Sequence, residues 1–358
     1  MKSKLFVVFG GQYGSEGKGQ IAQFLHSRIK FGTAVRVGGP NAGHTFHYAN
    51  GKKEVVQSIP VPAMSGALGV IGAAGVLIPE LLLAELQRGY EYMNEPVQLW
   101  VDDLAAIITP EHMAAESELK KSIGSTGEGV GAATAEKVMR RAVTALEFGL
   151  EKWLIDRSDS AVEVALTSRT GLLLNQMLLN SEMMLIEGTQ GYGLSLHTSG
   201  FYPFCTSREC TPQALYAETG INPANADQVE VVMVVRTFPI RVGGNSGPLA
   251  NEITWEQLGG MTGGYVRTPE ITTVTKKIRR IAKVDFGLIQ EAVLQCRPTA
   301  VALTFFDYLH PDAAGIVDPS GLEKHHWQTI QKWEEKIGVP IKFLSTGLNC
   351  TMSLRVTI

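Results

Sequence analysis

Short apolar runs recur along the chain and alternate with segments of helical periodicity. Buried strands are predicted at Leu5–Phe9, Ala34–Val37, Val70–Gly72, Met183–Ile186, Glu230–Val235 and Val301–Phe305. Amphipathic helices are predicted between them, at Ile21–Ile29, Glu80–Arg88, Ile289–Cys296 and Trp327–Ile337. Because uniformly apolar strands need cover on both faces, the pattern predicts an α/β fold. We expect a mostly parallel central sheet with helices on both faces.

Glycine-dense patches interrupt this alternation at residues 124–131, 188–193 and 243–247. Such patches are typical of long functional loops, so we expect large loop insertions. The sequence has neither a repeat of 20 to 50 residues nor a proline- or serine-rich linker. We therefore predict a single domain over residues 1–358.

The composition narrows the class of protein. The chain has 358 residues, 44% of them hydrophobic, which suffices for a substantial core. A formal net charge of −3 argues against a general nucleic-acid binder. The four cysteines show no paired metal-ligand spacing, so neither a disulfide framework nor a zinc site is expected. The longest nearly uncharged stretch, 66–78, is too short to cross a membrane, and we expect a cytoplasmic protein.

A glycine-rich loop, residues 10–19, follows the first strand and opens the first helix. Backbone N–H groups converge on an anion at such a turn, and Lys18 adds a positive charge. The loop is not a standard Walker A motif, because five residues separate Gly11 from Gly17 and Gly19 replaces the magnesium-binding Ser or Thr. Taken alone, it fits either a phosphate site or a tight strand-to-helix turn.

A second glycine turn, residues 38–45, follows the second strand. In a parallel sheet it should reach the same edge as the first loop, so the two are expected to share one ligand. It carries His44, and histidine can donate a proton near neutral pH. A lone histidine is more often structural, but the neighbouring Asn41 and Thr45 favour a catalytic role.

These motifs resemble those of the adenylosuccinate synthetase family. Residues 14–19 are similar to its GDEGKGK signature, and residues 41–45 match its NAGHT motif letter for letter. Further similar segments, in the family's order, lie at 124–127, 137–141, 187–191, 202–207 and 345–347. The resemblance extends over nearly the whole chain, whose length is similar to that of the compact archaeal branch.

The resemblance implies a ligase that uses a nucleoside triphosphate. In this family the γ-phosphoryl group goes to the 6-oxygen of a purine mononucleotide, and the amine of L-aspartate then displaces phosphate. The implied catalytic residues are Ser15, Lys18 and His44. Arg140 would reach the mononucleotide from a partner subunit, which implies a homodimer.

The family pattern also assigns binding residues. Those implied for the triphosphate are Gly14, Glu16, Gly17, Lys18, Gly19, Gly43, His44, Thr45, Arg279, Phe305, Asp307, Ser345, Thr346 and Gly347. Those implied for the mononucleotide are Ser15, Asn41, Ser125, Thr126, Arg140, Gln190, Cys205 and Thr206. Those implied for aspartate are Thr273, Val274, Thr275, Lys277 and Arg279. The pattern implies Mg²⁺ at Ser15 and Gly43.

Ser15 departs from the family pattern, which has an aspartate there that acts as the base for purine N1 and touches magnesium. A serine hydroxyl is no base near neutral pH. The smaller, neutral side chain leaves space for a purine 2-amino group, and the exchange resembles a viral subgroup that acts on dGMP. The proton acceptor would be the carboxylate of the substrate aspartate or an ordered water.

Two further departures concern the donor and the sugar. Phe305 replaces the lysine of the family's guanine-reading segment, which predicts relaxed preference for GTP and use of ATP or dATP. Phe305 could equally fill core at the end of a strand. Lys277 stands where the family has an arginine near the ribose, and a deoxyribose would tolerate this change.

We therefore predict a ligase joining aspartate to dGMP, with ordinary adenylosuccinate synthesis from IMP and GTP as the alternative. A nucleotide-binding regulator that lost catalysis together with its base is a rival from another class. Only the short basic run at residues 276–280 favours nucleic-acid binding, which we do not expect.

Overall fold

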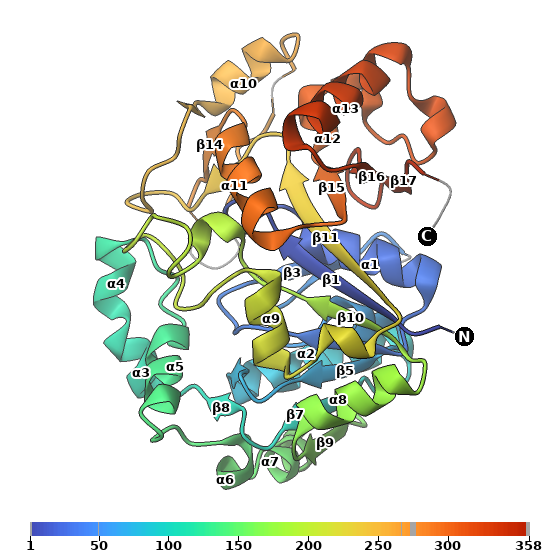
Figure 1. Ribbon diagram of the computed structural model, residues 1–358. Helices are drawn as coiled ribbons and strands as arrows, with labels where there is room; N and C mark the ends of the chain where they lie inside the picture. The colour runs from blue at the N-terminus through green and yellow to red at the C-terminus, as the bar shows by residue number, and fades with distance from the viewer. Residues whose placement is uncertain (1, 49, 266, 273–276, 356–358) are drawn as a thin grey trace.

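A ten-stranded sheet forms the centre of the computed structural model, which describes residues 2–48, 50–265, 267–272 and 277–355. The strand order is β17-β16-β15-β11-β1-β10-β2-β5-β7-β9, and every neighbouring pair is parallel except β16 with β17. The predicted mostly parallel sheet is confirmed (Figure 1).

The central strands are β1 (Lys4–Gly10), β2 (Thr33–Arg36), β5 (Leu68–Ile71), β7 (Gln98–Asp102), β9 (Glu163–Thr167), β10 (Met183–Glu187), β11 (Gln228–Arg236), β15 (Ala300–Thr304), β16 (Ile341–Ser345) and β17 (Thr351–Ser353). Smaller sheets contain β3 (His44–His47), β4 (Lys53–Val56), β6 (Val76–Leu77), β8 (Ala106–Ile107), β12 (Ile240–Arg241), β13 (Glu252–Ile253) and β14 (Arg280–Ala282).

The α-helices are α1 (Lys18–Ile29), α2 (Pro79–Met93), α3 (Pro110–Ala115), α4 (Ser117–Ser122), α5 (Val130–Val138), α6 (Ala145–Phe148), α7 (Leu150–Arg157), α8 (Thr170–Leu179), α9 (Pro212–Thr219), α10 (Trp255–Met261), α11 (Phe286–Cys296), α12 (Phe306–Leu309) and α13 (Lys324–Ile337). Short 3₁₀ turns are η1 (Val61–Ser65), η2 (Tyr192–Leu194), η3 (Pro223–Asn225), η4 (Pro311–Ala313) and η5 (Pro319–Gly321).

Helices cover both faces of the sheet, as the apolar strands require. Along β1, Leu5 and Val7 point into one core with α8, α9, α11 and α13, whereas Phe6 and Val8 point into another with α1, α2 and α7. Alternate residues of a strand face opposite sides, so one uniformly apolar strand serves two cores.

The predicted strands and helices are all present, with bounds that shift by a few residues. Phe305 is the clearest difference: β15 ends at Thr304, and Phe305 takes a left-handed conformation (φ 55°) before α12. Among the central strands, β7, β9, β16 and β17 were not predicted, because polar residues interrupt or bound their short apolar runs. In β9, for example, Glu163 is exposed and Val164 is buried.

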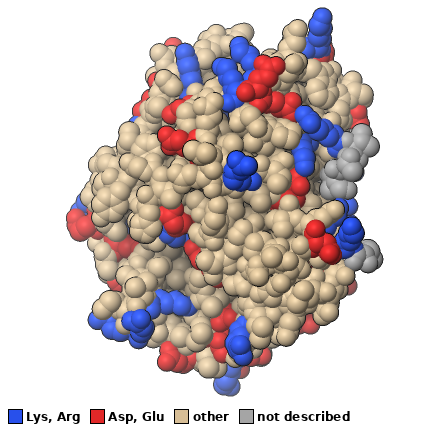
Figure 2. All heavy atoms as spheres, in the orientation of Figure 1, with Lys and Arg blue, Asp and Glu red and all other residues tan. Residues whose placement is uncertain are grey.

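The surface agrees with the low net charge. On the face in Figure 2, the described acidic and basic side chains are intermixed rather than gathered in one basic stripe. Among the described residues, none of the helices is both long and apolar enough to span a membrane. All four cysteines are free thiols, as expected.

Candidate active site

A cavity of about 420 Å³ lies beyond the carboxyl ends of β1, β2 and β10. The first glycine loop contributes Gly14 and Ser15 to its wall, and the second turn contributes Asn41, Gly43 and His44. The expectation that both turns reach one site is therefore correct. The volume is in the range of pockets that hold a small organic molecule.

The first loop is braced by its own side chains. The Glu16 carboxylate accepts hydrogen bonds from the backbone N–H of Gln12 (3.1 Å) and of Gly14 (2.7 Å). Lys18 donates to the same carboxylate and to the carbonyl of Gly14, each at 2.8 Å. Gly14 (φ 97°) has left-handed backbone, which favours glycine. Glu16 and Lys18 are buried and do not line the cavity, so they hold the loop shape in this structure.

His44 is held by two buried charges from neighbouring strand ends. Its Nδ1 contacts Glu187, the last residue of β10, and lies 2.9 Å from the guanidinium of Arg36, the last residue of β2. Because a carboxylate only accepts, we assign the Nδ1 proton to the bond with Glu187. The Nε2 atom has no hydrogen-bond partner among the described residues.

The electrostatics of this group keep His44 neutral. Burial and the nearby Arg36 lower the pKa of His44 to about 4. Burial raises the pKa of Glu187, but His44 and Arg36 outweigh it and hold that pKa below its usual range. Glu187 thus fixes the orientation of the neutral imidazole, and His44 lines the cavity with its buried Nε2 unpartnered among the described residues.

Ser15 lies beside cations rather than carboxylates. Its hydroxyl accepts a hydrogen bond from Arg279 at 2.7 Å, and its carbonyl accepts one from Arg236 at 3.0 Å. Arg236 forms a 2.6 Å ion pair with Glu270, and no contact joins Glu270 to Ser15 among the described residues. Among the described residues that line the cavity, Glu116 is the acidic one.

Seven of the eight residues implied for the mononucleotide line the cavity: Ser15, Asn41, Ser125, Thr126, Gln190, Cys205 and Thr206. Gln190 has left-handed backbone (φ 55°) and donates its amide N–H to Asn41 at 3.0 Å. This bond joins the loop after β10 to the second glycine turn. Arg140 is exposed after α5 and does not line the cavity.

The residues implied for the base of the triphosphate lie outside this cavity. Thr304 Oγ1 donates to the carbonyl of Glu16 at 2.6 Å, so Phe305 and Asp307 follow directly beside the first loop. Gln20, on α1, donates to Ser345 and to the Gly347 carbonyl, each at 2.8 Å. Thr346 is fully buried and bonds to the backbone of Ile316. Among the other residues implied for the triphosphate, Gly17 and Gly19 belong to the first glycine loop and Thr45 to the second turn. None of these three lines the cavity.

The predicted aspartate-binding segment is described only at its ends. Thr273, Val274 and Thr275 lie outside the described residues. The backbone N–H of Thr272 donates to the carbonyl of Lys277, and the backbone N–H of Lys277 donates to the hydroxyl of Thr272, each at 2.9 Å. Lys277 is exposed. Thr272 and Arg279 line the cavity, which brings both ends of the segment to the site.

Comparisons with known proteins agree with this geometry. The sequence model of the adenylosuccinate synthetase family matches residues 7–167 and 156–313. The chain belongs to the adenylosuccinate synthetase family. Its members are ligases that form a C–N bond, and the predicted enzyme class is thereby confirmed.

Relatives come from both archaea and a virus. An adenylosuccinate synthetase of Pyrococcus sp. (strain ST700) is 35% identical over 347 residues, 95% of each chain. The N6-succino-2-amino-2'-deoxyadenylate synthase of Vibrio phage phiVC8 is 36% identical over 315 residues, 85% of this chain and 86% of that protein.

Solved structures support the fold. A succinoaminodeoxyadenylate synthetase of cyanophage S-2L, bound to dGMP and dATP as an energy donor, has a TM-score of 0.80 at 28% identity and covers 99% of this chain and 96% of its own. Adenylosuccinate synthetase from Plasmodium falciparum has a TM-score of 0.79 at 20% identity, with 98% and 99% covered. The predicted fold class is confirmed.

Sequence reasoning gave no role to several charged residues around this cavity. Arg36 and Glu187 are the last residues of β2 and β10, and Arg241 is the last residue of β12 and lines the cavity. Arg241 donates to the carbonyls of Pro248 (2.9 Å) and Phe204 (2.7 Å), and burial lowers its pKa to about 10. A charged residue at the carboxyl end of an apolar strand was the available signal.

Proposed function

We propose that this ligase condenses L-aspartate with C6 of dGMP, driven by hydrolysis of ATP or dATP. The product would be N6-succino-2-amino-2'-deoxyadenylate, a precursor for DNA containing 2-aminoadenine. The observation that carries the proposal is Ser15, a small neutral side chain held by Arg279 where the family pattern has an aspartate. The names of one phage relative and of one similar solved phage structure support it.

The chemistry proceeds in two displacements. The purine 6-oxygen attacks the γ-phosphorus of the triphosphate, releasing the diphosphate and giving a 6-phosphoryl purine. The aspartate amine then attacks C6, and the C–O bond breaks to release inorganic phosphate. Both steps move negative charge, so positioned cations and hydrogen-bond donors provide most of the catalysis.

His44 is the residue best placed to respond to this charge. His44 lines the cavity, its buried Nε2 has no hydrogen-bond partner among the described residues, and its pKa of about 4 leaves it neutral before substrate binds. A bound polyphosphate would raise that pKa, because a nearby anion favours the protonated imidazole. His44 then donates Nε2–H to the transferring phosphoryl oxygens, while Glu187 stabilises the imidazolium.

The cavity offers no obvious protein base for purine N1. Glu116 is its one acidic lining residue among those described. That carboxylate already accepts backbone N–H bonds from Gly129 (2.9 Å), Gly131 (2.5 Å) and Ala132 (3.0 Å). We therefore retain the carboxylate of the substrate aspartate, or an ordered water, as the proton acceptor.

The donor site is expected to be less selective for guanine than the family pattern. In the family pattern Asp307 would accept from guanine; here its Oδ2 forms a 3.1 Å ion pair with Arg267, and its buried Oδ1 has no hydrogen-bond partner among the described residues. The Arg236 guanidinium packs on one face of the Phe305 ring at 3.7 Å. Phe305 thus has one face for stacking on a base of either kind.

Magnesium fits the Gly43 carbonyl better than Ser15. The Ser15 hydroxyl already accepts from a guanidinium, whose positive charge would repel the ion. Gly43 is exposed in the cavity wall and offers an oxygen, the ligand type that Mg²⁺ prefers. The other ligands would be phosphate oxygens of the substrate, and the metal would neutralise their charge.

The nucleotides and the metal that this enzyme needs are available in the cytoplasm, which is the location we propose.

A homodimer would complete the mononucleotide site. Exposed Arg140 lies among exposed apolar residues, Val138, Met139, Val143 and Leu146, as expected of a covered face. The Arg140→Ala variant should raise KM for the mononucleotide roughly tenfold or more, by loss of a charged hydrogen bond to phosphate.

Subunit mixing tests whether Arg140 acts across the interface. Equal amounts of Arg140→Ala and His44→Ala, unfolded and refolded together, should recover roughly a quarter of wild-type activity, because half the dimers then hold one intact site. Activity equal to the sum of the separately refolded variants would exclude a contribution from the partner.

Ordinary adenylosuccinate synthesis from IMP and GTP is the second candidate, favoured by the archaeal relative that aligns over 95% of the chain. A substrate panel separates the two. IMP, GMP, dGMP and AMP would each be combined with ATP, dATP and GTP, and phosphate release measured with aspartate and Mg²⁺. We expect turnover with dGMP and an adenine donor. Turnover on IMP but not on dGMP would overturn the proposal.

A further inference from the structure

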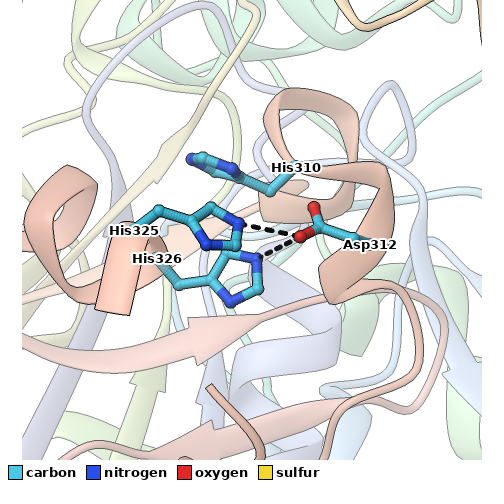
Figure 3. Close-up of side chains that lie close together, drawn as sticks. All are labelled: His310, Asp312, His325 and His326. Atoms are coloured by element: carbon cyan, nitrogen blue, oxygen red, sulfur yellow. Dashed lines mark hydrogen bonds and ion pairs between the residues drawn. The ribbon is translucent and has the colours of Figure 1, made fainter. Parts of the chain in front are cut away.

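Three histidines and an aspartate meet far along the chain from the catalytic turns. They are His310, Asp312, His325 and His326, and each offers one potential ligand atom within 4.8 Å of the others. Figure 3 shows that they come from two segments, around η4 and at the first turn of α13. None lines the catalytic cavity.

Asp312 is the centre of this cluster. Its Oδ2 lies 2.8 Å from Nε2 of His325 and 3.1 Å from Nε2 of His326. His326 is buried, whereas the side chains of His325 and Asp312 are 45% and 52% exposed. The cluster therefore has a fixed inner side and an outer side open to solvent, through which an ion could enter.

The hydrogen bonds of His326 define its role. Its Nδ1 accepts the backbone N–H of Glu323 at 3.1 Å, so in the neutral ring Nε2 carries the proton. That proton is donated to Asp312. His326 therefore orients the carboxylate as an outer partner, and the remaining groups with available lone pairs are Asp312, His310 and His325.

His310 is also supported from outside the cluster. Its Nε2 lies 2.9 Å from the hydroxyl of Thr329, which suits either tautomer of the ring. Its ring packs against Phe306 with 4.8 Å between centroids.

We propose that His310, Asp312 and His325 bind a divalent transition-metal ion of the zinc class, with His326 holding Asp312 and solvent completing the coordination. Two imidazoles and a carboxylate suit Zn²⁺, whereas Mg²⁺ prefers oxygen ligands alone. Zinc–ligand bonds of about 2.0–2.2 Å would put ligand atoms roughly 3.3 Å apart, so Nε2 of His325 would move slightly away from Asp312, now at 2.8 Å, and the half-exposed side chain of His325 has solvent on one side.

The ion would link the segment after α12 to the first turn of α13. His310 directly follows α12, which contains Asp307 of the donor site, and His325 lies in the first turn of α13. Zinc should therefore stabilise the folded protein and hold the segment after α12 against α13. The cysteine pattern gave no sign of this site, because none of its ligands is a cysteine.

Zinc binding by untagged, full-length protein tests the proposal. After treatment with chelator and dialysis, the protein would be titrated with ZnCl₂ against a chromophoric chelator, and bound metal counted by elemental analysis. We expect about one zinc per chain and a rise in Tm of roughly 3 °C or more. The same concentration of MgCl₂ should leave Tm unchanged.

Matched variants locate the ion. His325→Ala and Asp312→Asn alter exposed side chains, so they should fold, and each should lower zinc affinity at least tenfold. His197→Ala, another exposed histidine, is the control and should bind as wild type does. Zinc affinity that is equal in His325→Ala, Asp312→Asn and wild type, or no zinc bound by wild type, would overturn the proposal.

Discussion

Replacing His44 with alanine is expected to lower kcat by roughly a hundredfold or more, as loss of a general acid does. The reason is geometric: Nε2 of His44 has no partner among the described residues, and the cavity wall places it where the two glycine turns meet. Steady-state phosphate release at saturating substrates measures the effect. An unchanged kcat would remove His44 from the acid role.

Two comparisons separate catalysis from folding. His47→Ala removes another buried histidine of β3 that does not line the cavity, so its kcat should stay near that of wild type. Glu187→Gln keeps the shape but loses the charge that stabilises protonated His44. By NMR, the pKa of His44 should rise from about 4 when the triphosphate binds, and in Glu187→Gln it should be lower than in wild type in both the free and the bound state.

Exchanging Ser15 for aspartate is expected to reverse substrate preference, from dGMP toward IMP. The new carboxylate would pair with Arg279, which now donates to the Ser15 hydroxyl, and would take space beside C2 of the purine. It would also supply a base for N1. We expect the ratio of kcat/KM for dGMP over IMP to fall at least tenfold, measured separately on each nucleotide.

The Ser15→Asn variant is the matched control for Ser15→Asp. Asparagine has nearly the size of aspartate but no charge and no basic oxygen. If space decides, both variants should lose dGMP activity; if the base decides, only Ser15→Asp should gain activity on IMP. Higher dGMP activity in Ser15→Asp than in wild type would contradict the argument from space at C2.

The sheet and the meeting of the two turns were predictable because they follow from local pattern. Uniformly apolar strands imply a parallel sheet, and the carboxyl ends of its central strands lie at one edge. That reasoning predicts that the turns carrying Ser15 and His44 reach one site, and both residues line the cavity. The edge strand β9 was not predicted, because its exposed polar residues weaken the apolar pattern.

Interactions between distant residues were not predictable in this way. The pairing of Arg279 with Ser15 spans 264 positions, and the pairing of His44 with Glu187 spans 143. Nothing local in the sequence indicates which charges meet. Lys18 illustrates the same limit: its motif suggests a lysine facing phosphate, whereas Glu16 and the Gly14 carbonyl hold it inside the loop.

A competition between two mononucleotides tests the central claim most directly. Equal concentrations of dGMP and IMP would react in one tube with aspartate, ATP and Mg²⁺, and mass spectrometry would compare the succinyl products. The ratio of products reports the ratio of kcat/KM, free of differences in enzyme activity between samples. The account predicts that the 2-amino-deoxy product exceeds adenylosuccinate at least about tenfold. An excess of adenylosuccinate would contradict it.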